Sequence, residues 1–198
     1  MPEPLQELNE SLFFTINNGL QNPVNDYLIG YSTFLGDGKF LFPILVISLF
    51  LFRRTEFLKY LLLAVSTFAI AGIVLNLMKA MFGMPRPLTF FKESIEIGQV
   101  AINVMFEPLY YHSFPSGHSQ TAFTAAHFIS KVFLRSGEGE QMFLWKGLPY
   151  LVAIVVGISR IYVGAHFPID VFIGALLGWG ISSGLWWFYV KMKLVSKI

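Results

Sequence analysis

Three short groups of polar residues stand at the ends of long apolar runs of this chain. The groups are Lys79, Arg86 and Pro87; Pro115, Ser116, Gly117 and His118; and Ser159, Arg160, His166 and Asp170. Charged residues beside long apolar segments are costly, so they are usually functional. Cationic side chains bind phosphate, and histidine exchanges protons near neutral pH. The three groups together therefore predict phosphate binding combined with histidine chemistry.

The third group has the spacing of a histidine oriented by a carboxylate. Pro168 suits the first turn of a helix, and Asp170 then falls within the same turn. Its carboxylate can reach back to one ring nitrogen of His166, fix the tautomer and leave the other nitrogen free to attack, as in a serine hydrolase triad. The alternative is a buried ion pair that closes a tight turn.

The second group is typical of a helix start. Pro115 suits a first turn, while Ser116 and Gly117 leave backbone N–H groups that face an anion. His118 follows directly, so its imidazole would sit beside a bound phosphate and donate a proton to a leaving oxygen. The alternative is a helix cap with an interfacial histidine. His127 lies in the middle of an apolar run with no charged neighbour in sequence, so we interpret it as structural.

In the first group, Lys79 and Arg86 are seven residues apart, about two helical turns if the helix continues. Gly83 and Pro85 stand between them and predict that the helix unwinds before Arg86. Both cations would then bend toward one anion. The alternative is that each snorkels at the end of a span.

The composition is that of an integral membrane protein. Of 198 residues, 55% are hydrophobic and 13% are charged, and the mean hydropathy is +0.60, which is too apolar for an ordinary soluble domain. The chain has no cysteine, which excludes disulfides, thiolate metal sites and a cysteine nucleophile. A net charge of +2 without a basic run gives no indication of nucleic acid binding.

Five main apolar segments are long enough, or nearly so, to span a bilayer as helices. They cover residues 27–52, 57–82, 116–134, 148–163 and 168–190, and the first is interrupted by polar residues at 36–39. We expect residues 1–26 to form an amphipathic segment at the membrane interface and residues 83–115 to form a loop on the outer face. The sequence thus predicts an all-α, polytopic helical bundle with a single domain over residues 1–198.

Basic residues near the ends of the spans predict the orientation, because short cytoplasmic loops are enriched in lysine and arginine. They are Arg53, Arg54 and Lys59; Lys131, Arg135 and Lys146; and Lys191, Lys193 and Lys197. Counting spans outward from them places the loop 83–115 and the connection 164–167 on the opposite face. The three polar groups are therefore expected to meet on that outer face.

The three groups resemble the signature of the type 2 phosphatidic acid phosphatase superfamily, which includes lipid phosphatases, glucose-6-phosphatases and vanadium haloperoxidases. Six residues separate Lys79 from the Arg86–Pro87 pair, and Pro115 to His118 match the second part. In the third part, five residues separate the Ser159–Arg160 pair from His166, and three more separate His166 from Asp170. The resemblance implies a haloperoxidase-like helical core of six spans, where the apolar segments give five.

The resemblance also implies a role for each residue. His166 would be the nucleophile that forms a phosphohistidine, Asp170 would orient it, and His118 would be the general acid. The phosphoryl oxygens would be held by Lys79, Arg86, Ser116, Gly117 and Arg160. Three fixed cations would take the place of a metal, so no metal or cofactor is expected.

We expect a metal-independent phosphatase acting on a lipid phosphate or pyrophosphate at the outer face of a membrane, which the resemblance implies to be the bacterial plasma membrane. Candidate substrates are undecaprenyl pyrophosphate, phosphatidylglycerophosphate, phosphatidic acid and lipid A 1-phosphate. The alternative enzyme is a phosphotransferase that uses the same phosphohistidine.

Three other functions are less favoured. A small transporter would carry repeated halves and midplane charges, whereas here the charges gather at one face. A haloperoxidase is disfavoured because those relatives are soluble. A metal site built from His118, His166 and Asp170 would be opposed by three nearby cations. The sequence does not indicate the oligomeric state.

Overall fold

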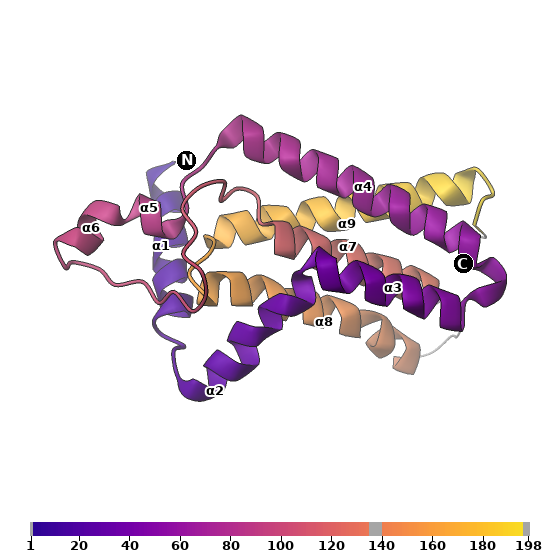
Figure 1. Cartoon of the computed structure of the whole chain (residues 1–198), viewed down its shortest axis with the longest axis horizontal. Helices are drawn as coiled ribbons and strands as arrows, with labels where there is room; N and C mark the ends of the chain where they lie inside the picture. The colour runs from indigo at the N-terminus through magenta and orange to yellow at the C-terminus, as the bar shows by residue number, and fades with distance from the viewer. Residues whose placement is uncertain (1, 135–139, 196–198) are drawn as a thin grey trace.

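The computed structural model describes residues 2–134 and 140–195, with no account of the side chains of 140–144. In this part of the chain every regular element is helical, which confirms the predicted all-α class. The elements are α1 (Glu3–Asn17), α2 (Pro23–Asn25), η1 (Asp26–Gly30), η2 (Tyr31–Gly36), α3 (Gly38–Phe52), η3 (Arg54–Glu56), α4 (Phe57–Phe82), α5 (Pro87–Phe90), α6 (Lys92–Glu96), α7 (Gly117–Val132), α8 (Glu140–Tyr162) and α9 (Pro168–Lys191). The long helices run along one axis, and α1, α5 and α6 gather at one end (Figure 1).

Helix α7 lies at the centre of the bundle, against both α8 and α9. Helix α9 turns a stripe of small residues toward it, namely Gly174, Gly178 and Ser182, all buried. A Cβ atom at Gly178 would lie 2.2 Å from the carbonyl oxygen of Gln120, so no larger residue fits without moving a backbone. This close packing sets the start of α9 against the start of α7, where the Ser116 N–H donates to the Asp170 carbonyl over 2.9 Å.

Helix α4 ends where the sequence predicted that it would. Lys79 is in its last turn, and Gly83 caps the helix with φ = 53°, a left-handed conformation that favours glycine. Four residues from 83 to 86 follow outside any helix before α5 begins. The chain therefore turns back toward the bundle between the two cations of the first group.

Helix α1 packs on the turn between α8 and α9. Its buried stripe is Asn9, Phe13 and Asn17. The Asn9 side-chain oxygen accepts from the backbone N–H of Ile169 over 3.0 Å, and the Asn17 amide donates to the carbonyl oxygen of Tyr162 over 2.8 Å. Helix α1 thus ties the end of α8 to the start of α9. Its place relative to the membrane interface stays a prediction.

The loop 83–115 contains the two short helices α5 and α6 and is fixed to the bundle by aromatic contacts. Phe91 stacks on Phe13 of α1 with 6.2 Å between ring centroids and lies 5.9 Å from the ring of Phe167. Farther along, Phe106 meets Phe34 of η2 edge to face at 5.4 Å. The loop therefore covers the end of the bundle where the three polar groups lie.

Two described helical stretches are long and apolar enough to cross a bilayer, Arg54–Glu96 and Pro168–Lys191. The pair Pro23–Gly36 and Gly38–Phe52 would add a third span, bent by 67° at the break that the sequence placed at 36–39. The predicted number of five to six spans is larger than the two or three identified by length and hydropathy in this part of the chain.

Two predicted boundaries differ from the structure. Helix α8 begins at Glu140, well before the predicted position 148. The prediction started too late because polar residues in the first turns lower the hydropathy of that stretch. Pro115 was expected in the first turn of the next helix and this was wrong: α7 begins at Gly117 with Ser116 as its N-cap. Arg135 and Lys197, used to predict the orientation, lie outside the described residues.

Candidate active site

The turn between α8 and α9 places His166. Gly164 has φ = 76°, and a Cβ there would lie 2.7 Å from the carbonyl oxygen of Asn103, so the turn requires glycine. The next two backbone N–H groups, of Ala165 and His166, both donate to the Arg160 carbonyl, over 3.1 and 3.2 Å. Pro168 then opens α9, as predicted, and Asp170 is its third residue.

One side of the His166 ring faces a carboxylate and a hydroxyl. The Nδ1 atom lies 3.6 Å from Asp170 Oδ2 and 3.4 Å from Ser113 Oγ. Ser113 Oγ donates to the same carboxylate oxygen over 2.5 Å, and so does the Phe167 N–H over 2.9 Å. Asp170 is thus fixed by two donors, and Ser113 bridges it to the imidazole.

Ser113 was missed by the sequence analysis. It is 1% exposed and stands in an irregular part of the loop, outside any helix. No spacing or neighbour in the sequence singles it out, because it meets Asp170 only after the chain has folded.

The other side of the His166 ring faces Arg86. Its Nη1 atom lies 3.4 Å from Nε2 of the ring. The same guanidinium donates to the carbonyl of Ala165 over 3.1 Å and to that of Tyr111 over 2.8 Å. These backbone contacts hold the cation beside the nitrogen that points away from Asp170.

Lys79 and Arg160 join Arg86 in a group of three cations around His166. All three are close enough to influence the pKa of its imidazole. Arg160 is 6% exposed and donates from Nη1 to the hydroxyl of Thr33 over 2.5 Å. Its Nε atom is buried without a hydrogen-bond partner among the described residues. Buried donors without partners are rare, so this one is available to an anion. Thr33 was missed by the sequence analysis, because it lies in η2, far from the three groups along the chain.

Burial lowers the pKa of His166 well below its usual range, and the positive charges of Arg86, Arg160 and Lys79 lower it further. The side chain is 2% exposed. The imidazole is therefore neutral at neutral pH, which is the form able to attack an electrophile.

The second group lies beside the same cations. Ser116 is the N-cap of α7, and its hydroxyl accepts from the Ser119 N–H over 3.5 Å. Gly117 is the first residue of the helix, so its N–H is one of those left without an intrahelical partner. His118 is half-buried in this first turn, within electrostatic reach of Arg160 and Lys79. All three groups thus meet at one end of the bundle.

The site is cationic and suits an anion. No three His, Asp or Glu side chains of the described residues are arranged to hold a metal ion. Three cations, a helix N-terminus and two histidines match the needs of a tetrahedral phosphoryl group.

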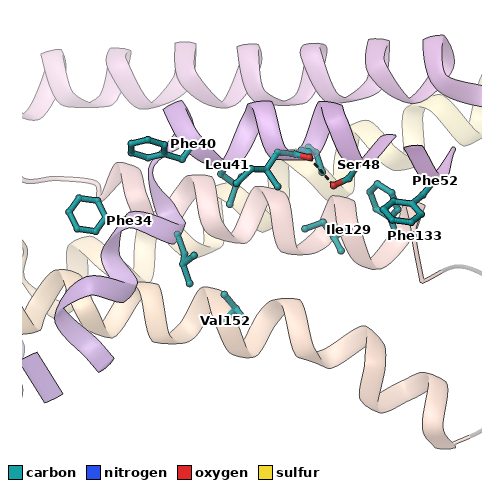
Figure 2. A pocket seen from close by; sticks show the side chains of 11 residues that line it. Phe34, Phe40, Leu41, Ser48, Phe52, Ile129, Phe133 and Val152 are labelled. Carbon is teal, nitrogen blue, oxygen red and sulfur yellow. Dashed lines mark hydrogen bonds between the residues drawn. The ribbon is translucent and has the colours of Figure 1, made fainter. Parts of the chain in front are cut away.

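Two apolar cavities lie in the bundle, and one of them reaches this site. One, of about 330 Å³, is lined by Asp170 itself together with Phe82, Phe90 and Phe167. The other, of about 400 Å³, runs along α3 between that helix, α7 and α8, with Phe34 and Phe40 toward one end and Phe52 and Phe133 toward the other (Figure 2).

Comparison with known proteins decides the family. The model of the PAP2 superfamily matches residues 60–193, which include all three polar groups. The chain belongs to the PAP2 superfamily. The resemblance carried by the three groups is thereby confirmed.

Relatives agree with this assignment over most of the chain. It is 31% identical to the Bacitracin transport permease protein BcrC of Bacillus licheniformis, over 95% of this chain and 83% of that protein. It is 34% identical to Phosphatidylglycerophosphatase B of Bacillus subtilis, over 88% and 77% of the two chains. The crystal structure of Aquifex aeolicus LpxE superposes with a TM-score of 0.69 at 35% identity, covering 90% of this chain and 94% of the other. The chain is a hydrolase of the PAP2 lipid phosphatase type.

Proposed function

We propose that this protein removes a phosphate group from a membrane lipid through a phosphohistidine on His166. The observation that carries the proposal is the asymmetry of the His166 ring. Its Nδ1 side faces Ser113 and Asp170, whereas its Nε2 side faces Arg86. A neutral imidazole whose Nδ1–H points to a carboxylate has a free lone pair on Nε2, directed toward the cations that attract phosphate.

The reaction proceeds in two displacements. Nε2 of His166 attacks phosphorus, a P–N bond forms and the bond from phosphorus to the leaving oxygen breaks, while His118 donates a proton to that oxygen. Water then attacks the phosphohistidine, and the P–N bond breaks as His118 takes a proton from the water. Lys79, Arg86 and Arg160, with Ser116 and the Gly117 N–H, hold the phosphoryl oxygens in both steps. Asp170 stabilises the charge that develops on the ring.

The substrate is a lipid phosphate monoester or pyrophosphate. The relatives named above include a phosphatidylglycerophosphatase, and another, 30% identical over 88% of this chain, is an undecaprenyl-diphosphatase of Sulfolobus acidocaldarius. The apolar cavity beside Asp170 is lined by Phe82, Phe90 and Phe167 and suits the first part of a hydrocarbon chain. The candidates are undecaprenyl pyrophosphate, phosphatidylglycerophosphate, phosphatidic acid and lipid A 1-phosphate.

We further propose that five to six helices cross the bacterial plasma membrane and that the site opens on its outer face. Helix α7 is not among the long apolar stretches because it has only 16 residues. It lies within the bundle, and its buried residues include Ser119, Gln120, Thr124 and Ser130. A helix surrounded by protein does not need an apolar surface to cross a bilayer. The basic residues at the other end of the bundle support the orientation.

The test is phosphate release by the purified protein from the four candidate lipids, with excess chelator present. We expect release from at least one lipid, and a loss of more than about 10³-fold in His166→Ala, as for the removal of a nucleophile. Lys193→Gln is the control, since it removes an exposed side chain at the opposite end and should leave turnover within a few-fold. Turnover in a folded His166→Ala protein, or strict dependence on a divalent metal, would contradict the mechanism.

A further inference from the structure

A third cavity, with several polar residues in its wall, lies at the end of the bundle away from His166. It has a volume of about 640 Å³ and is bordered by the second halves of α7 and α9 and the first half of α8. Ser183 in its wall is 13 residues along α9 from Asp170, which corresponds to roughly 20 Å of helix. The two sites are therefore too far apart to bind the same phosphate group.

His127 is a buried residue of this cavity wall and has one unsatisfied ring nitrogen. Its side chain is 5% exposed and lines the wall. The Nδ1 atom pairs with the hydroxyl of Tyr150 over 2.8 Å, whereas Nε2 is buried without a hydrogen-bond partner among the described residues. If the tyrosine donates to Nδ1, Nε2 carries the proton and needs an acceptor. Leaving such a group unpaired is unfavourable, so the geometry indicates an acceptor supplied by a ligand.

Two lysines face the same space. Lys131 follows His127 by one helical turn and lies on the same face of α7, and Lys146 comes from α8. The hydroxyl of Ser130 donates to the carbonyl oxygen of Lys146 over 2.9 Å, which holds the two helices together at this point. Within the described part of the chain no Asp or Glu lines the cavity. The charges therefore favour an anion.

Tryptophans form the remaining wall and indicate where the ligand lies. Trp186 is 8% exposed, whereas Trp187 is 62% exposed, and both line the cavity with Trp179. Tryptophan is enriched at the level of lipid head groups in membrane proteins. A quaternary ammonium group would suit aromatic faces but would be repelled by the two lysines. An anionic group attached to an apolar body matches all of these features.

We propose that this cavity binds the phosphate group of an anionic phospholipid, with His127 Nε2 donating to a phosphate oxygen and Lys131 and Lys146 neutralising its charge. The cavity volume lies in the usual range for small-molecule sites and is larger than one phosphate ion requires, so glycerol and the start of the acyl chains also fit. Basic pockets between membrane helices bind anionic head groups by this combination of charge and apolar contact.

Thermal unfolding of the full-length protein in detergent, with added lipid, tests the proposal. We expect dioleoylphosphatidylglycerol to raise the melting temperature by several degrees, and dioleoylphosphatidylcholine or inorganic phosphate at the same concentration to raise it much less. Lys131→Gln combined with Lys146→Gln should weaken the apparent lipid affinity about tenfold or more. Lys193→Gln removes an exposed lysine at the same end and should retain the wild-type affinity.

A second variant keeps the test informative if the double variant folds poorly. His127→Gln retains a side chain that can donate hydrogen bonds but moves the donor, so it should lower the lipid affinity while the response to inorganic phosphate stays small. An equal response to both lipids, a response to inorganic phosphate alone, or a double variant with the affinity of Lys193→Gln would each overturn the proposal. Equal binding of both lipids would show that charge does not determine the ligand.

Discussion

Two buried histidines, at opposite ends of the same bundle, differ in what surrounds them. His166 is 2% exposed and His127 is 5% exposed. Both ring nitrogens of His166 lie within 3.4 Å of a polar side-chain atom, whereas His127 has a partner on Nδ1 only. Burial is thus common to both residues and does not distinguish their roles. The groups in contact with each ring are the basis for the two roles that we propose, attack on a substrate for His166 and donation to a ligand oxygen for His127.

The cations at the two ends also differ. Arg86 is fixed by hydrogen bonds to two backbone carbonyls, and Arg160 is fixed by Thr33. Lys131 and Lys146, at the other end, have long flexible stems and compact charges. Fixed guanidinium groups stabilise the developing charge of a phosphoryl transfer because no reorganisation is needed during the reaction. Flexible ammonium groups suit reversible binding of head groups that vary in shape.

Asp170→Asn should produce the largest change, because it removes the carboxylate that His127 lacks. We expect turnover to fall by about 10²–10⁴-fold, as when the orienting aspartate of a histidine-based triad is replaced by asparagine. An asparagine oxygen in the place of Oδ2 still accepts from Ser113 and Phe167, so the fold should be retained. Phosphate release and circular dichroism measure the two effects separately.

Turnover within threefold of wild type in folded Asp170→Asn would remove the distinction between the two histidines. The carboxylate would then serve only to fix the turn that carries His166. Lipid binding at the cavity around His127 should not change in this variant, because about 20 Å of helix separates the two sites.

Much of the catalytic end was predictable from sequence, because local spacing fixes local geometry. The three residues from Pro168 to Asp170 lie in the first turn of α9, so the carboxylate had to lie close to His166. Gly83 predicted the end of α4 for a similar reason, since it takes a left-handed conformation. The convergence of the three groups at one end followed from alternating the direction of successive helices.

Other parts of the site depend on contacts between segments far apart in the chain. Ser113, in an irregular segment, reaches Asp170, and Thr33, in the short helix η2, reaches Arg160. Neither segment is long enough to give a periodic signal in the sequence. Residues 1–26 were predicted as an amphipathic segment, yet the buried stripe of α1 contains the polar residues Asn9 and Asn17. Their partners are backbone groups near the turn between α8 and α9. The apolar pattern shows which residues avoid water, but it does not show which polar residues find partners.

Gly174→Ala should have the next largest effect, on stability at the catalytic end. A Cβ at this position would lie 2.5 Å from the carbonyl oxygen of Ser116, so α9 would have to move away from α7. We expect a loss of about 1–3 kcal/mol in the free energy of unfolding, as for overpacking elsewhere, together with reduced turnover. Gly184→Ala is the matched control in the same helix, since nothing lies within 4 Å of its Cβ position.

Thermal unfolding of the two glycine variants compares the ends of α9 directly. Gly184→Ala should match or slightly exceed the wild-type stability, because alanine favours helix more than glycine by about 0.5–1 kcal/mol. Equal stability of both variants would mean that the contact between α7 and α9 does not hold Ser116 and Asp170 together.

Ser113→Ala and Ser183→Ala form the most sensitive comparison, since each removes one hydroxyl at one end of the molecule. Ser113 donates to Asp170 and lies beside His166, so its loss should reduce turnover by roughly five- to tenfold, the value of one hydrogen bond of about 1 kcal/mol. Ser183 lies in the wall of the other cavity, and its loss should leave turnover unchanged. An unchanged rate in Ser113→Ala would mean that the Asp170 carboxylate can hydrogen-bond His166 directly. The Ser113 hydroxyl would then not be needed to orient the imidazole.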